Sequence, residues 1–155
     1  MRLAVIHENI DFQDSYRVFV SGTGDQPVLK IPTVGMVRLF YSGVPRPHYS
    51  VHYIKGEQRG AGTILYFAAL DWVLRHGIKD AQGLLASDST LSPDAIRARV
   101  RFQQMYDHYI YTYPHPDDNV KVHRDDGTDW RRPATDEEAM MWRLRREAPI
   151  AFDYG

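Results

Sequence analysis

Hydrophobic and polar positions alternate along the first third of this chain, which is the pattern of half-buried β-strands. The alternation and the β-forming residues predict strands over 2–6, 16–20, 34–41 and 49–54, with a short edge segment over 28–31. A Gly-Thr-Gly-Asp run at 22–25 predicts a turn. We therefore expect the first third to form a mostly antiparallel sheet, with room for one short helix between residues 6 and 16.

The period of the apolar positions changes after residue 63. Leu65, Ala69, Trp72 and Val73 share one face of a helix, which predicts a helix over 64–76 that ends at Gly77. A short buried strand is expected over 82–86, followed by a polar turn. A second helix is expected to begin with Ser92 as its N-cap and Pro93 as its first residue. Its apolar stripe consists of Ala95, Ala98, Phe102, Met105, Tyr106 and Tyr109.

The last quarter of the chain predicts two strands and a helix. The strands are expected over 111–113 and 120–124, with a turn at 125–127. Thr135 and Glu138 have the spacing of a capping box, which predicts a last helix ending before Pro149. The pattern as a whole predicts an α/β (α+β) domain with a mixed, mostly antiparallel central sheet flanked by helices. The domain is expected over 1–124, with the turn and helix of 125–155 packed on it.

Composition narrows the class of protein. The 155 residues carry a formal net charge of -1, so nucleic acid or an anionic surface would have to meet a local patch. With 0 Cys the chain has no disulfide, thiolate metal site or cysteine nucleophile. His48 and His52 share strand parity and could chelate a metal, but no metal is expected, because the chain has no cysteine and Pro47 adjoins His48. The polar N-terminus and the absence of a long apolar run favour a soluble, cytoplasmic protein without a membrane partner. A monomer or homodimer is expected.

The segment 57–63, Glu-Gln-Arg-Gly-Ala-Gly-Thr, is the first candidate for a functional site. It joins a predicted strand to a predicted helix. The first backbone N–H groups of a helix have no intrahelical partner, and with the helix dipole they favour an anion such as a pyrophosphate. Glycine lets a ligand approach the backbone and permits positive φ.

Strand, glycine turn, helix, strand and second helix together resemble the GNAT superfamily of acyl-CoA-dependent N-acyltransferases. The motif part covers 49–109, and the order of elements covers 2–124. The family's cofactor turn is matched by 59–64, Arg-Gly-Ala-Gly-Thr-Ile, and its next helix by 92–95, Ser-Pro-Asp-Ala. The resemblance implies acetyl-CoA as co-substrate, bound by the backbone of Arg59, Gly60, Ala61, Gly62 and Thr63, with Ile54, Gln58 and Ser92 beside it.

Two positions depart from the family pattern. Ile64 stands where the cofactor turn has a small residue, and Arg99 stands where the family often has a tyrosine that acts as general acid. These departures keep a non-catalytic binding module with a degenerate cofactor site as the alternative function.

Three residues are candidates for catalysis. His52, on a predicted strand, carries an imidazole suited to take a proton from an amine; a half-buried, hydrogen-bonded histidine is the structural alternative. Tyr106 is a candidate proton donor to the leaving thiolate, with Tyr109 as a weaker one, and core packing is the alternative. Asp88 follows a central strand, where open sheets place functional groups, although a turn-capping aspartate explains it equally well.

The acceptor is expected to be a primary amine on a bulky or macromolecular molecule, because little chain precedes the turn to enclose it. An amine-bearing modified nucleic-acid base, which implies DNA modification, a protein amine and an amino sugar all fit. A polar, partly basic helix face favours a polyanion, and a solvated surface is the alternative; it is formed by Arg97, Arg101, Gln104 and His108, with Arg99 beside it. A further alternative is an interaction protein that docks through its last helix.

Overall fold

The computed structural model describes residues 17–44, 46–86, 90–91, 93–114, 119–123, 126–133, 140–148 and 150–155. Four strands form successive antiparallel hairpins: β1 (Val18–Gly22), β2 (Pro27–Ile31), β3 (Gly35–Ser42) and β4 (His48–Gly56). The helices are α2 (Ala61–His76) and α3 (Pro93–Tyr106), with 3-10 turns η2 (Lys79–Ala81) and η3 (Asp107–Tyr109). The remaining strands are β5 (Leu85–Ala86), β6 (Thr90–Leu91), β7 (Ile110–Pro114), β8 (Asn119–His123), β9 (Asp129–Pro133), β10 (Met140–Leu144) and β11 (Phe152–Asp153).

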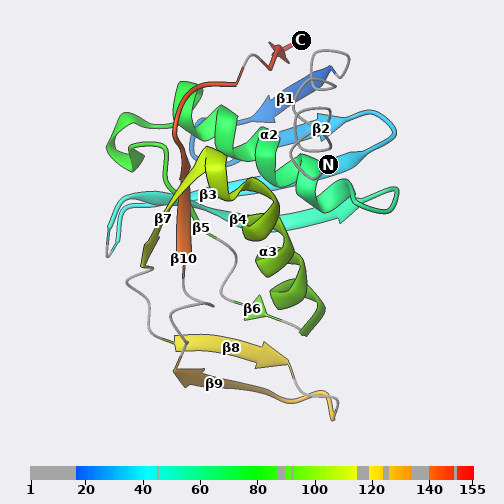
Figure 1. The fold of residues 1–155 in the computed structure, drawn as a ribbon, viewed down its shortest axis with the longest axis vertical. Helices are drawn as coiled ribbons and strands as arrows, with labels where there is room; N and C mark the ends of the chain where they lie inside the picture. Colours follow the sequence, from blue (N-terminus) through cyan, green and yellow to red (C-terminus); the bar gives the residue numbers. More distant parts are fainter. Residues whose placement is uncertain are drawn as a thin grey trace.

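The main sheet has eight strands in the order β11-β1-β2-β3-β4-β5-β10-β7, and β6, β8 and β9 form a separate small sheet (Figure 1). In the main sheet β1–β11 and β4–β5 pair in parallel, and the other neighbours are antiparallel. An α+β fold with a mixed, mostly antiparallel sheet is therefore confirmed. No helix in the described part of the chain is long and apolar enough to cross a membrane.

The core lies between the main sheet and α2, which crosses one face of it (Figure 1). The inward positions of β3 and β4 alternate as expected, with Val37, Leu39 and Val51 buried. Leu65 and Trp72 of α2 are buried against them. Helix α3 adds Phe102, Tyr106 and other apolar side chains to the same side, where Phe102 contacts Tyr66 and Trp142. We call this the inner face of the sheet and the opposite one the outer face.

Several local predictions are confirmed. Helix α2 ends at the predicted Gly77, and Pro93 is the first residue of α3. The hairpin turn lies at 23–26, where Thr23 and Gln26 exchange backbone hydrogen bonds. The segment predicted as an edge is instead interior, because β2 lies between β1 and β3. Residues 2–6 and 87–89 lie outside the described part of the chain.

The prediction of a last helix is wrong for residues 140–144. Residues Met140–Leu144 form β10, which pairs with β5 and β7 on its two sides. Met141 and Trp142 point to opposite faces of the sheet and both are fully buried. A strand buries both side chains in this position, whereas a helix would leave β5 and β7 without the partner that lies between them.

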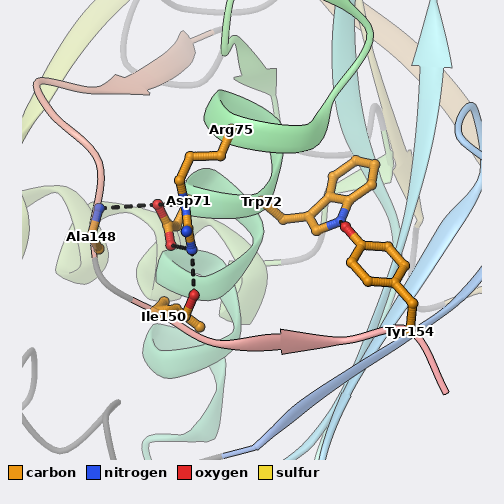
Figure 2. A network of polar contacts seen from close by, with 6 residues as sticks. All are labelled: Asp71, Trp72, Arg75, Ala148, Ile150 and Tyr154. Atoms are coloured by element: carbon orange, nitrogen blue, oxygen red, sulfur yellow. Dashed lines mark hydrogen bonds and ion pairs between the residues drawn. The ribbon is translucent and has the colours of Figure 1, made fainter.

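A network of polar contacts fixes the C-terminal segment to α2 (Figure 2). The Asp71 carboxylate accepts hydrogen bonds from Arg75 and from the Ala148 backbone N–H. Arg75 also donates to the Ile150 carbonyl, and the Trp72 indole N–H donates to the Tyr154 hydroxyl at 2.9 Å. The chain then continues into β11, which pairs with β1 at the edge of the sheet.

Candidate functional site

The turn between β4 and α2 has the geometry expected of an anion site. Gly60 precedes the helix with φ 82 and ψ -1, the left-handed region that favours glycine. Its neighbours Gln58 and Arg59 are exposed. The helix has no side-chain N-cap hydrogen bond and no acidic residue in its first turn. The positive end of its dipole is therefore not offset by a carboxylate on the first turn of the helix.

The first residues of α2 combine close packing with open space. A Cβ on Gly56 would lie 2.9 Å from the Ala61 Cβ, so strand and helix approach closely there. A Cβ on Gly62 would meet nothing within 4 Å. Thr63 is half-buried, and Ile54 and Ile64 are partly buried against the core. Ile64 thus contacts the core, which explains a bulky residue where the family pattern has a small one.

Strands β4 and β5 share only a short parallel pairing in the described part of the chain. They pair only at Tyr49–Leu85 and Ser50–Ala86, and the Tyr49 N–H donates to the Leu84 carbonyl at 2.9 Å. Beyond Ser50, β4 continues to Gly56 with no strand beside that edge in the described residues. A strand edge of this kind presents backbone N–H and C=O groups to a ligand. The edge leads directly to the glycine turn.

His52 is the extra residue of a β-bulge. Arg38 pairs with Tyr53 and Leu39 with Val51, so β4 places one additional residue opposite that step of β3. His52 and Tyr53 are both exposed, and the His52 ring lies 6.2 Å from that of Phe40 on the outer face. The half-buried alternative for His52 is therefore wrong, and its imidazole is open to an incoming molecule.

Tyr106 lies on the other face of the sheet. Its side chain is fully buried and packs on Phe67, with ring centroids 4.9 Å apart, and on Phe102 at 5.0 Å. Its hydroxyl has no hydrogen-bond partner among the described residues, and burial raises the pKa of Tyr106. The structure therefore does not bring Tyr106 and His52 together. Asp88 and Ser92 lie outside the described residues.

Arg99 is not part of a solvated helix face. Only 3% of it is exposed, and its guanidinium carbon lies 5.6 Å from the centre of the Trp142 ring. Arg97, Arg101, Gln104 and His108 are exposed, as the pattern predicts. The predicted basic face is thus narrower than expected, because Arg99 turns inward to an aromatic ring that β10 supplies.

Among the hollows of the structure are two that the sequence did not predict. One, of 340 Å³, is bordered by Phe67 of α2, Tyr109 and the segment 144–148. The other is a larger groove of 840 Å³ at the C-terminal end of α2. Its cationic side chains come from separate segments, so no local motif marks it; they are Arg46, Arg75, Lys79 and Arg143.

Among the residues that the structure describes, no cluster of three His, Asp or Glu side chains could hold a metal ion. Comparison of the chain with protein-family models, with curated proteins and with solved structures gives no match. The candidate site therefore consists of the glycine turn, the uncapped start of α2, the open edge of β4 and the exposed His52.

Proposed function

We propose that this protein is an acetyl-CoA-dependent N-acetyltransferase of the GNAT-like kind. The observation that carries the proposal is the edge of β4 beyond Ser50, with which no described strand pairs, beside the uncapped N-terminus of α2. The free strand edge offers hydrogen bonds to an extended amide-bearing chain, and the helix start offers N–H groups to phosphates. A thioester co-substrate such as acetyl-CoA has both chemical features.

The glycine turn is suited to hold the pyrophosphate of that co-substrate. Gly60 adopts its positive φ, Gly62 leaves the space above the helix start open, and Arg59 adds an exposed positive charge. Backbone N–H groups of Gly62 and Thr63 belong to the first turn and have no intrahelical acceptor. Two backbone donors and one cation thus belong to the turn that would hold the phosphates.

The transfer itself forms an N–C bond and breaks a C–S bond. The amine nitrogen attacks the thioester carbon, the amine proton passes to a base, and the thiolate takes a proton as it leaves. His52 is the proposed base, since it is exposed on the bulge of β4. A backbone N–H on the open edge of β4 would polarise the thioester oxygen.

The proposed acceptor is a bulky or macromolecular primary amine, such as one on a modified nucleic-acid base or on a protein. His52 and the neighbouring Tyr53, of which 48% is exposed, lie on the open outer face of β4. No described element encloses these two side chains as a small-molecule pocket would. A large acceptor could therefore reach His52 without a change in the fold.

A second candidate function is a non-catalytic module that binds the same co-substrate. The observation that favours it is Tyr106, whose hydroxyl is buried on the face opposite His52. If Tyr106 cannot reach the thiolate, none of the described candidate residues except the weaker Tyr109 remains as its proton donor. Such a module would bind acetyl-CoA with the same turn and strand edge as the enzyme, but it would not catalyse acetyl transfer.

Thermal unfolding with and without acetyl-CoA tests the proposal. Ligand at about 100 times its Kd adds roughly 2.7 kcal/mol, which raises the midpoint by several degrees. Gly62→Trp should abolish the rise without unfolding the protein, because the space around Gly62 is open. Gly43→Trp, in an exposed loop, is the matched control and should keep the rise.

No rise for the natural protein at millimolar acetyl-CoA would overturn both candidate functions. If the rise is present, release of free thiol in the presence of amines separates them. Thiol release that depends on the amine identifies the enzyme, and binding without release identifies the module.

A further inference from the structure

The groove at the C-terminal end of α2 gathers positive side chains from separate segments of the chain. Arg46, Lys79 and Arg143 line it, and none of the three has a described carboxylate within ion-pair distance. Arg75 also lines the groove, but its charge is offset by Asp71. Among the described residues that border the groove, none has an acidic side chain. A chain with a net charge of -1 thus gathers in one hollow three cations with which no described carboxylate pairs.

Tyrosine rings alternate with these cations on the outer face of β7 and β10. Tyr111 and Tyr113 are two residues apart on β7 and share that face, and Arg143 pairs with Tyr111 across the strands. The Arg46 guanidinium lies 5.8 Å from the centre of the Tyr113 ring, and that of Arg145 lies 4.2 Å from the centre of the Tyr111 ring. The groove therefore continues as a row of cations and rings.

We propose that this row and groove bind single-stranded nucleic acid. Cations follow a phosphate backbone, and exposed rings and guanidinium planes stack on unpaired bases. Tyr111 is 40% exposed, and this exposed part of the side chain is the proposed contact for a base. A simple phosphate ion would need the cations alone and would leave the alternating rings unexplained.

The proposed surface is separate from the glycine turn. Helix α2 has 16 residues, and at about 1.5 Å per residue its two ends lie roughly 24 Å apart. The turn precedes its first residue, and Gly77 and Lys79 follow its last. The inference does not depend on acyl transfer, and loss of one activity should leave the other intact.

Fluorescence anisotropy with a labelled single strand of about 20 nucleotides tests the proposal. We expect binding that weakens steeply between about 50 and about 200 mM salt. The double variant Arg46→Gln/Lys79→Gln should weaken binding of the strand about tenfold or more. Because each phosphate contact contributes about 0.7 to the slope of log K against log salt, loss of two contacts should reduce that slope by about 1.4. Neither side chain donates a hydrogen bond in the structure, so the fold should be retained.

Two controls identify the surface and the ligand. Arg97→Gln/Arg101→Gln removes the same charge from the exposed face of α3 and should leave the affinity unchanged. Tyr111→Ala should weaken binding of the strand about tenfold and leave binding of inorganic polyphosphate unchanged. Equal loss in the α3 variant, no loss in the groove variant, or no effect of Tyr111→Ala would overturn the proposal. The acetyl-CoA midpoint shift, measured on the same variants, should not change.

Discussion

Asp71 and Arg75 form a two-point ion pair one helical turn apart on α2, with the Asp71 side chain fully buried and that of Arg75 only 21% exposed. Arg75 Nε lies 3.0 Å from Oδ1 of Asp71, and Nη2 lies 2.6 Å from Oδ2. The same carboxylate accepts the Ala148 N–H at 3.0 Å. The Asp71 side chain therefore forms an ion pair within the helix and a hydrogen bond to the backbone of the C-terminal segment.

Asp71→Asn should lower the free energy of unfolding by about 3 kcal/mol, because it removes one partner of a buried pair and leaves the other without its counter-charge. Urea denaturation measures the loss. Asp153→Asn is the matched control, since Asp153 pairs with Arg17 at 2.7 Å but their side chains are 38% and 72% exposed. The control should cost less than about 1 kcal/mol. Equal losses in the two variants would contradict the structural role of Asp71.

Removal of the hydroxyl group should have opposite effects on stability at two buried tyrosines, Tyr49 and Tyr106. The Tyr49 hydroxyl accepts the Ile78 N–H at 3.0 Å and donates to the Gly24 carbonyl. Tyr49→Phe should therefore destabilise the protein by about 1–3 kcal/mol. The Tyr106 hydroxyl is buried without a partner, so Tyr106→Phe should leave stability unchanged or raise it. Thermal unfolding of both variants in one buffer gives the comparison.

Tyr106→Phe also separates packing from chemistry. If Tyr106 only fills the core, thiol release is unchanged in the variant. A large fall in turnover with intact stability would show that the hydroxyl donates a proton to the leaving thiolate. That result would mean that the thiolate reaches Tyr106, whose ring packs on Phe67 and Phe102 in the present structure.

The elements that the sequence predicted correctly are those with a strong local period. The hairpin strands alternate, and α2 has both its apolar face and the glycine that ends it. Segment 140–144 has no such period, since Met-Met-Trp-Arg-Leu is apolar on both sides of a strand. Its conformation depends on pairing with β5 and β7. The capping-box spacing that precedes it is a local pattern and contains no information about these strands, which are distant in the sequence.

The candidate site was predictable in part for the same reason. The glycine turn is a local motif, and the structure places it where the sequence did. The bulge at His52 depends on the register between β3 and β4, which the separate strand patterns do not contain. The burial of Arg99 depends on Trp142, and the cationic groove joins Arg46, Lys79 and Arg143 from three segments.

Alanine at the two glycines of the turn should have opposite effects on stability. Gly60 has φ 82, a conformation that costs an ordinary residue about 1–2 kcal/mol, so Gly60→Ala should destabilise the protein by about that amount. Gly62 lies inside the helix with open space around it, so Gly62→Ala should stabilise by about 0.5–1 kcal/mol. Urea midpoints measure both. Destabilisation by both substitutions would indicate that the helix begins after Gly62.

His52→Gln is the most direct test of the proposed chemistry. The side chain is exposed, so the free energy of unfolding should change by less than about 0.5 kcal/mol. If His52 takes the amine proton, kcat should fall by about 10²–10⁴ while the acetyl-CoA midpoint shift is retained. His108→Gln, at another exposed histidine, should leave kcat unchanged. A normal kcat in the His52 variant would mean that the amine loses its proton to another group or to water, and the bulge would then serve only the geometry of the strand.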